Sequence, residues 1–298
     1  MQPEIPSAPS SRISVVIPAY NEESGLADVV RGLRASMESS GRPFEIIVVD
    51  DGSLDRTPEV ARGLGGVTVV THTKNRGYGA ALKTGIRAAM GDQILICDAD
   101  GTYPPESIPE LLAGADGHDM VVASRTGPSV EIPIFRRLAK GILRRLAIYL
   151  SESEIPDLNS GLRIFRKESV MPHFPILPAG FSFTTTITLA MLCNEGSVSY
   201  VPCNYNKRRG RSKIRPLRDT VNFLILILRT ILYFNPLKIF LPVSLAIGAM
   251  FVVSFAYDLF VLDDLTEKTL IFFLSAVQIL AIGVIADLIT KRVYGGGR

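Results

Sequence analysis

Two long segments near the end of the chain contain no charged residue, and they constrain the fold more than any other feature. They cover residues 239–257 and 270–286, and a short polar loop, residues 263–269, lies between them. A helix rises about 1.5 Å per residue, so roughly 20 residues span the ~30 Å hydrocarbon layer of a membrane. A pair of buried core helices is the alternative, but the short connecting loop favours a transmembrane hairpin.

Charges around these segments predict the orientation of the hairpin. The loop carries Asp263, Asp264 and Glu267 with Lys268 as its one basic residue, whereas Lys and Arg residues precede the first segment and follow the second. Loops rich in Lys and Arg stay in the cytoplasm. Residues 1–12 are rich in Pro and Ser and lack the apolar core of a secretory signal, so we expect a disordered tail there. We therefore predict a multi-pass membrane protein whose two ends are cytoplasmic.

The larger N-terminal part alternates short apolar segments with amphipathic ones. The apolar segments are rich in Val and Ile, as strands covered on both faces are, and comprise residues 13–17, 46–49, 67–70, 94–97 and 120–122. Helical spacing of apolar residues characterises segments such as 22–37 and 78–90. This series predicts an α/β fold with a mostly parallel central sheet. With 298 residues, 47% of them hydrophobic, the chain can form one such domain in addition to the hairpin.

Polar side chains follow four of the predicted strands. The strands lead into Pro18-Ala19-Tyr20-Asn21-Glu22, Asp50-Asp51-Gly52-Ser53, Asp98-Ala99-Asp100 and Ser124-Arg125. Open α/β sheets bind ligands beyond the carboxyl ends of their strands. Taken singly, Asn21 or Ser53 could be a helix cap and Asp51-Gly52 a turn. Their occurrence at the same relative position after four strands favours a binding site.

Asp98 and Asp100 lie one residue apart where a buried strand is predicted to end. On an extended backbone, residues i and i+2 point to the same side, so we expect the two carboxylates to converge. A divalent cation would relieve their repulsion, and hard oxygen ligands with open positions suit Mg²⁺ or Mn²⁺, completed by substrate phosphates. A solvated acidic loop is the alternative, but it does not explain why a buried strand should lead into it.

Six motifs follow one another between residues 13 and 215. They are VVIPAYNEE (15–23), IIVVDDGSLDRT (46–57), NRGYGAALKTGI (75–86), DADGTYPPE (98–106), NSGLRIFRK (159–167) and RRGRSK (208–213). In order and spacing they resemble the motifs of the family 2 glycosyltransferases of GT-A fold, and within that family the polyprenyl-phosphate sugar synthases such as dolichyl-phosphate mannosyl- and glucosyltransferases. The two-helix hairpin is also similar to that subgroup. The resemblance implies metal-dependent, inverting transfer of a sugar from a UDP- or GDP-linked donor to a polyprenyl phosphate, such as undecaprenyl or dolichyl phosphate. The product would be a sugar donor for cell-envelope or protein glycosylation.

The resemblance also implies roles for individual residues. Those expected beside the nucleotide are Pro18, Tyr20, Glu22, Asp51 and Asp98. Asp98 and Asp100 would bind the metal that clamps the diphosphate. The expected contacts of the acceptor or donor phosphates are Arg125, Arg163, Arg209 and Lys213, and the expected catalytic set is Asp98, Asp100, Arg125 and Arg163. Thr102 stands where mannosyl-type relatives often carry Gln, which leaves the third metal ligand and the donor sugar open.

Two basic segments predict contact with an anionic membrane. Residues 207–218 contain seven basic residues out of twelve and no acidic one, and residues 134–150 alternate five basic residues with apolar ones at helical spacing. Basic amphipathic helices bind anionic interfaces. A mostly apolar segment, residues 221–234, leads into the first span. A nucleic-acid partner would require a basic face over the whole domain together with aromatic stacking residues, so we expect none.

The expected organisation has four parts. They are a disordered tail (1–12), a cytoplasmic GT-A domain (13–215), a juxtamembrane interfacial helix (216–238), and the transmembrane hairpin with a short cytoplasmic tail (239–298). The alternatives are a membrane-anchored glycosyltransferase that acts on another lipid or glycan, and a non-catalytic nucleotide-binding scaffold. The sequence leaves the oligomeric state open, a homo-oligomer included.

Cysteines and histidines add little to the predicted site. The three cysteines, Cys97, Cys193 and Cys203, lack metal-type spacing, and we expect them to be reduced core residues. The three histidines, His72, His118 and His173, fall outside the motifs, so none is an evident general base and we expect core or surface roles.

Overall fold

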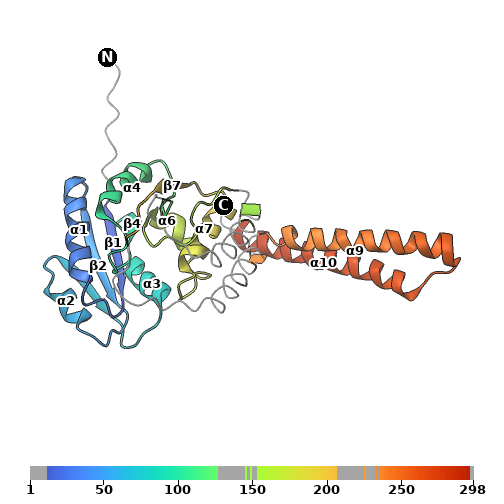
Figure 1. Cartoon of the computed structure of the whole chain (residues 1–298), viewed down its shortest axis with the longest axis horizontal. Helices are drawn as coiled ribbons and strands as arrows, with labels where there is room; N and C mark the ends of the chain where they lie inside the picture. Colours follow the sequence, from blue (N-terminus) through green and yellow to red (C-terminus); the bar gives the residue numbers. More distant parts are fainter. Residues whose placement is uncertain are drawn as a thin grey trace, which may run out of the picture. The chain divides into compact units, whose positions relative to one another are not determined.

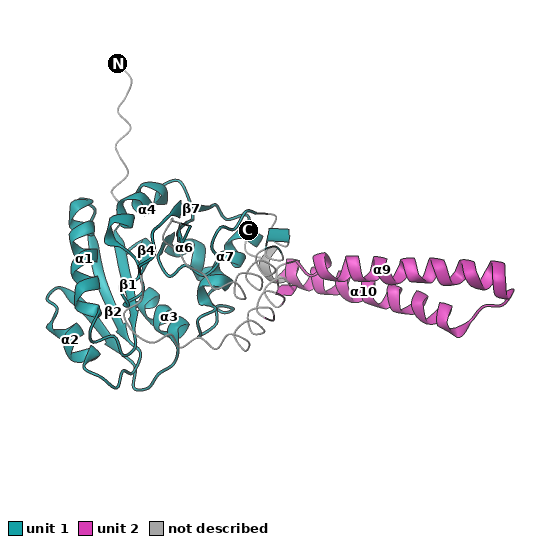
Figure 2. Cartoon of the chain, in the orientation of Figure 1, with its two compact units in different colours: residues 1–223 teal, residues 224–298 magenta. Residues whose placement is uncertain are grey.

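The computed structural model describes residues 12–126, 153–206 and 235–295, together with a few isolated positions between 145 and 233. The chain divides into two compact units, Met1–Phe223 and Leu224–Arg298, which Figure 2 shows in separate colours. Several predicted features lie outside the described residues, apart from residue 12 and those isolated positions. They are the tail, the segments 134–150 and 221–234, and the basic segment 207–218 with Arg209 and Lys213. Those expectations therefore stay predictions.

The first unit is built around a seven-stranded sheet with flanking helices (Figure 1). Its strands are β1 (Ile13–Ala19), β2 (Phe44–Asp50), β3 (Val67–Thr71), β4 (Gln93–Ile96), β5 (Met120–Ser124), β6 (Arg163–Arg166) and β7 (Val198–Pro202). Its helices are α1 (Leu26–Ser39), α2 (Thr57–Gly63), α3 (Tyr78–Ala88), η1 (Pro105–Ser107), α4 (Ile108–Ala115), α6 (Lys167–Val170), η2 (Met171–His173) and α7 (Phe183–Cys193). All five predicted strands are present, while β6 and β7 were not predicted.

The strand order is β3-β2-β1-β4-β6-β5-β7. Parallel pairs join β1 to β2 and β4, β2 to β3, and β5 to β7, whereas β6 runs antiparallel to both β4 and β5. The prediction of an α/β fold with a mostly parallel sheet is confirmed. Because β6 is reversed, the turn that precedes it lies at the same edge of the sheet as the carboxyl ends of β4 and β5.

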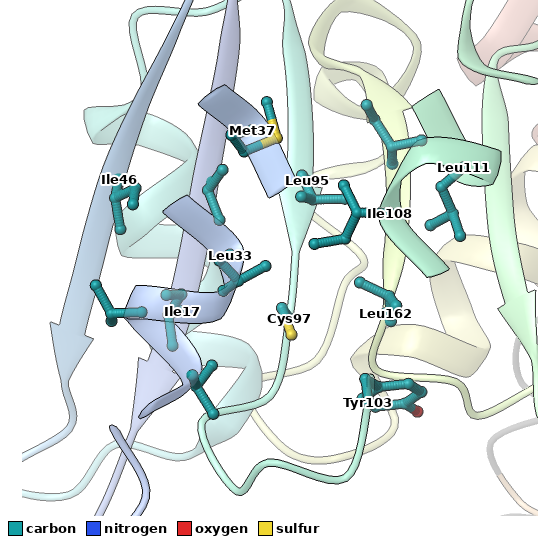
Figure 3. Close-up of a cluster of buried hydrophobic side chains, with 14 of the residues drawn as sticks. Ile17, Leu33, Met37, Ile46, Leu95, Cys97, Tyr103, Ile108, Leu111 and Leu162 are labelled. Atoms are coloured by element: carbon teal, nitrogen blue, oxygen red, sulfur yellow. The ribbon is translucent and has the colours of Figure 1, made fainter. Parts of the chain in front are cut away.

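The core lies on both faces of the sheet. Along β1, Ile13, Val15 and Ile17 pack into one apolar cluster with side chains from α1 and α4, part of which Figure 3 shows. Val16 points to the other face and packs into a second cluster with side chains from α3 and α7. A strand covered on both faces needs apolar residues at successive positions, which is why the strands read as continuous Val- and Ile-rich segments.

The second unit is a hairpin of two long apolar helices (Figure 2). It consists of α9 (Leu237–Tyr257), the π-helical η3 (Asp258–Leu262) and α10 (Glu267–Gly295). Most of its large apolar side chains are exposed, Val253 at 72% for example. Such exposure is unfavourable in water and suits a hydrocarbon layer, so the helices are suited to a transmembrane hairpin as predicted.

A polar contact joins the two helices near the loop of the hairpin. The Asp258 carboxylate is fully buried, and its Oδ2 accepts hydrogen bonds from the backbone N–H and hydroxyl of Thr266 and from the hydroxyl of Thr269. The Thr269 hydroxyl also contacts that of Ser254 at 2.6 Å. These hydrogen bonds satisfy Oδ2 and its three donors inside the hairpin, whereas Asp258 Oδ1 is buried without a hydrogen-bond partner among the described residues.

Candidate active site

The loops that follow β1 and β2 support each other at the carboxyl edge of the sheet. The backbone N–H of Asn21 donates to Ser53 Oγ over 3.0 Å, and Asn21 Oδ1 accepts from the Leu54 N–H over 2.8 Å. The Glu22 N–H donates to Thr57 Oγ1 over 2.8 Å. Asn21 adopts a left-handed conformation, φ 54°, which Asn tolerates better than most residues. These polar residues therefore form one surface, rather than two separate turns.

Asp51 organises the loop that leads into α3. Its buried carboxylate accepts hydrogen bonds from the backbone N–H groups of Arg76 (2.9 Å) and Gly77 (2.8 Å). It also accepts from Nδ1 of His72 over 2.6 Å, while Nε2 of His72 contacts the Thr84 hydroxyl at 2.9 Å. His72 is buried, as expected for a histidine with a structural role, and it connects Asp51 to the body of α3.

The first residue of α3, Tyr78, reaches the acidic pair. Its hydroxyl donates to Asp98 Oδ1 over 2.8 Å, and its ring stacks on that of Phe181 with centroids 5.5 Å apart. Burial, and then the charge of Asp98, raise the pKa of Tyr78, so the phenol stays protonated and acts as the donor.

The acidic pair lies in a turn, which corrects one step of the sequence argument. β4 ends at Ile96, and Ala99 and Asp100 form a turn completed by Gly101 with φ 71°, so the prediction of an extended backbone through Asp98 and Asp100 is wrong. The buried Asp100 accepts hydrogen bonds at Oδ1 from the Thr102 hydroxyl (2.7 Å) and N–H (3.2 Å). A short side chain that hydrogen-bonds two residues away favours turn formation over continued pairing.

The turn before β6 lies against Asp98. A Cβ added to Gly161 would be 2.1 Å from Asp98 Oδ2, so the carboxylate lies directly on the glycine backbone. The Gly161 N–H donates to the Tyr103 hydroxyl over 2.6 Å, and the Ser160 hydroxyl contacts the same oxygen at 3.2 Å. Sequence reasoning assigned no role to Gly161, Tyr78 or Tyr103, although all three lie inside the quoted motifs.

Arg163 does not face the edge of the sheet, contrary to its predicted contact with a phosphate. Its side chain is 0% exposed. The guanidinium donates to the carbonyl of Ser160 from Nε and Nη2 (3.1 and 2.5 Å), and from Nη1 to the carbonyl of Thr184 (3.0 Å) and the hydroxyl of Thr188 (2.8 Å). Such contacts use the donors of the guanidinium inside the protein and leave no exposed atom for a phosphate.

Arg125 is paired with Asp157, a residue that sequence reasoning missed. Its Nε and Nη2 donate to the two carboxylate oxygens over 2.6 and 2.8 Å, and its guanidinium lies over the Tyr205 ring at 5.3 Å. Burial alone would raise the pKa of Asp157, but hydrogen bonds from Arg125 and its charge outweigh burial and lower it. A signal was present, because Asp157 precedes the NSG motif by two residues and an arginine-rich site favours a nearby acidic partner.

Metal-type clusters of three or more His, Cys, Asp or Glu residues are absent from the part of the chain that the structure describes. Asp98 and Asp100 offer two carboxylates after β4, and a cation held by them would need further ligands from a substrate or from water.

Comparison with known proteins identifies the family. Residues 14–174 match glycosyl transferase family 2. The chain belongs to this family. A second match covers the end of the chain, where residues 235–291 match the GtrB C-terminal hairpin. The chain is accordingly a glycosyltransferase with a GT-A domain and a membrane-type hairpin, which confirms the resemblance read from the motifs.

Two relatives within the family bear names of lipid-phosphate sugar transferases. A dolichol-phosphate mannosyltransferase of Pyrococcus furiosus is 36% identical over 214 residues, which cover 68% of this chain and 59% of that protein. The match thus spans less than two thirds of that relative. An undecaprenyl-phosphate 4-deoxy-4-formamido-L-arabinose transferase of Pseudomonas paraeruginosa is 31% identical, and the match covers 97% of this chain and 88% of that protein.

Solved structures of two synthases are similar in fold to this chain. Glucosyl-3-phosphoglycerate synthase from Mycobacterium tuberculosis, in complex with Mn²⁺, UDP-glucose and phosphoglyceric acid, superposes with a TM-score of 0.59 at 23% identity, over 74% of this chain and 80% of that one. Mannosyl-3-phosphoglycerate synthase from Rubrobacter xylanophilus gives a TM-score of 0.59 at 22% identity, over 74% and 73% of the two chains. At these identities the likeness concerns the fold.

Proposed function

We propose that this glycosyltransferase transfers a sugar from a UDP- or GDP-linked donor to a polyprenyl phosphate, with inversion at the anomeric carbon. One observation carries the proposal: a single chain combines an acidic pair at the ligand-binding edge of an α/β sheet with a hairpin suited to a membrane. The names of the two relatives, which pair a sugar with dolichol phosphate or undecaprenyl phosphate, support it.

The nucleotide is proposed to lie beyond the carboxyl ends of β1 and β2. Pro18 belongs to β1, Tyr20 and Glu22 follow it, and Asp51 follows β2, all at the edge where open α/β sheets bind ligands. Asp51 has a second contribution in addition to its proposed contact with the base or ribose. Because both of its oxygens accept hydrogen bonds from backbone N–H groups of the loop before α3, Asp51 also fixes the conformation of that loop.

Asp98 and Asp100 would hold Mg²⁺ or Mn²⁺, and their chemistry fits such an ion. Both supply hard carboxylate oxygens, and Thr102 fixes the orientation of Asp100. When bound, a divalent cation supplies positive charge that stabilises the leaving nucleoside diphosphate. The complex of a similar fold with Mn²⁺ and UDP-glucose supports an ion of this class.

The acceptor is proposed to be a lipid monophosphate because the described residues at this edge offer no evident general base. A phosphate monoester with a second pKa of about 6 is mostly dianionic at pH 7, so its own oxygen can attack the sugar without deprotonation. Arg125, Arg209 and Lys213 are the proposed contacts of the acceptor phosphate. For Arg163 we propose a positioning role instead, because its guanidinium is enclosed in the core.

We also propose that the GT-A domain and both chain ends lie in the cytoplasm. The acidic loop of the hairpin and its basic flanks support this orientation. It would place the catalytic domain where nucleotide sugars are made.

The function is tested with the full-length protein in liposomes that contain undecaprenyl phosphate, supplied with a panel of UDP- and GDP-sugars. We expect release of a nucleoside diphosphate and formation of a lipid that carries one phosphate and one sugar. Release of a nucleoside monophosphate as the primary product would instead mean sugar-phosphate transfer. Transfer to an undecaprenol or glycan control, with none to the lipid phosphate, would refute the proposed acceptor. The Asp98→Asn variant is the matched control for turnover by this site.

A further inference from the structure

We infer that Tyr78 and Gly161 are positioning residues that hold the Asp98 carboxylate from two sides in the orientation in which it binds the metal ion. The inference rests on the proposed function, because it takes Asp98 as a metal ligand. It assigns a role to two further residues. The Tyr78 hydroxyl donates to the Asp98 carboxylate, and Gly161, which has no Cβ, leaves room for it.

The two oxygens of Asp98 have different neighbours. Oδ1 accepts the Tyr78 hydroxyl over 2.8 Å, while Oδ2 lies where a Cβ on Gly161 would be 2.1 Å away. Rotation of the carboxylate would break the first contact or press against the backbone at the second. Tyr78 and Gly161 therefore restrict the orientation of the Asp98 side chain without contributing a metal ligand themselves, as residues around metal ligands commonly do.

Tyr78 can act in this way because the start of α3 is fixed from two sides. Asp51 accepts the N–H groups of Arg76 and Gly77, and the Ala80 N–H donates to the carbonyl of Ala179 over 3.0 Å. Close packing adds to this, since a Cβ on Gly79 would lie 2.2 Å from the carbonyl oxygen of Pro178. The hydroxyl of Tyr78 is thus held at Asp98 by the backbone of its own helix.

Gly161 is held equally well from the other side. Arg163 donates to the carbonyl of Ser160, and the Thr185 hydroxyl donates to Asn159 Oδ1 over 2.5 Å, which ties the turn 159–161 to α7. The Tyr103 hydroxyl accepts the Gly161 N–H. The buried guanidinium of Arg163 thereby acts on the site through the turn, which explains why a cation would be kept in the core.

The ring and the hydroxyl of Tyr78 can be separated by experiment. The ring stacks on Phe181, and this contact survives the Tyr78→Phe substitution, whereas the hydrogen bond to Asp98 does not. Mn²⁺ binding to the full-length protein in detergent is measured by titration with electron paramagnetic resonance, once with saturating UDP and once with GDP. Loss of a residue that orients a ligand typically lowers metal affinity about 10- to 100-fold, and we expect about 10-fold for Tyr78→Phe.

Tyr200→Phe is the matched control, because the Tyr200 hydroxyl is buried in β7 with no hydrogen-bond partner among the described residues. It should bind Mn²⁺ as the unmodified protein does. Gly161→Ala should weaken binding at least as much as Tyr78→Phe, and its thermal midpoint shows whether it folds.

The outcomes separate the inference from the proposed function. If Asp98→Asn binds Mn²⁺ as tightly as the unmodified protein, Asp98 is not a ligand and the proposed metal site fails together with the inference. If Asp98→Asn loses binding while Tyr78→Phe keeps full affinity, the metal site stands and the positioning role of Tyr78 is overturned. An equal loss in Tyr78→Phe and Tyr200→Phe would also overturn it.

Discussion

Replacing Asp157 by Ala should destabilise the first unit strongly, because it would leave Arg125 partly buried without its counter-ion. The Arg125 and Asp157 side chains are 20% and 12% exposed. Asp157 also accepts the backbone N–H groups of Arg125 and Asn159 over 3.2 and 3.0 Å, so it connects the end of β5 to the turn before β6. One substitution therefore removes an ion pair and a connection between two segments of the site.

The size of the effect follows from the number and burial of these contacts. A hydrogen bond to a charged group contributes about 1.5–3 kcal/mol, and breaking a buried pair by removing one partner costs about 3–5 kcal/mol. Because both side chains keep some access to water, which screens their charges, we expect the low end, about 3 kcal/mol. For a unit of 150–250 residues that corresponds to a decrease of about 6–12 °C in thermal midpoint.

The assay is thermal unfolding of the full-length protein in detergent. Asp28→Ala is the matched control: Asp28 also pairs with an arginine, Arg31, at 2.8 Å, but both side chains are largely exposed, Arg31 at 71% and Asp28 at 58%. Exposed pairs contribute roughly 0–1 kcal/mol, so the midpoint should fall by no more than a few degrees. Equal decreases in the two variants would refute the reasoning, as would a double-mutant cycle of Asp157→Ala with Arg125→Met that gives no coupling.

The destabilisation caused by Asp157→Ala should also depend on pH. The folded-state pKa of Asp157 is lowered, so its contribution to stability is fully present above the ordinary Asp value near 4 and is lost as pH falls through the lower folded value. The difference in midpoint between Asp157→Ala and the unmodified protein should therefore be constant around neutral pH and shrink in acid. A difference that grows below about pH 4 would contradict the sign.

Three further predictions concern the acidic pair and the hairpin. Asp100→Asn should lower turnover about 100-fold or more while the fold is kept, and full activity of that variant in the presence of a chelator would argue against a metal site. Asp258→Ala should loosen the end of the hairpin, because three donors lose their acceptor. Protease cleavage in the loop 263–266 should therefore be faster in this variant than in the control Asp264→Ala, which removes an exposed side chain. In a Cys193→Ser background, Asp264→Cys should react with an impermeant thiol reagent outside intact cells and Glu38→Cys should not; the reverse pattern would invert the proposed orientation.

The strands that sequence reasoning found share one physical property. They are buried on both faces, so apolar residues occupy successive positions, and this pattern is visible without a structure. β6 has no such pattern, because it is four residues long, Arg163–Arg166, with arginine at both ends. Its place between β4 and β5 depends on contacts with distant strands, which local periodicity does not encode.

The residues of the site divide in the same way. Sequence position was enough to bring the ends of β1, β2 and β4 to one edge, because parallel strands place their carboxyl ends together. It was not enough to orient Arg163, since an arginine in a motif fits a phosphate and a set of carbonyls equally well. The threonines of α7 were the one local hint of an internal partner, because the Thr188 hydroxyl accepts from the guanidinium and the Thr185 hydroxyl donates to Asn159 in the turn before β6.

The reversed direction of β6 explains how two motifs some sixty residues apart form one site. Ile96 at the end of β4 pairs with Arg163 at the start of β6, so the turn before β6 lies beside the residues that follow β4. A parallel β6 would begin at the opposite edge of the sheet, and Gly161 would be far from Asp98. The antiparallel register also directs Arg163 inward toward α7. A shift of one residue would turn every β6 side chain to the other face and take the guanidinium away from the turn that it holds. β6, which was not predicted from the sequence, therefore determines that Gly161 lies against Asp98.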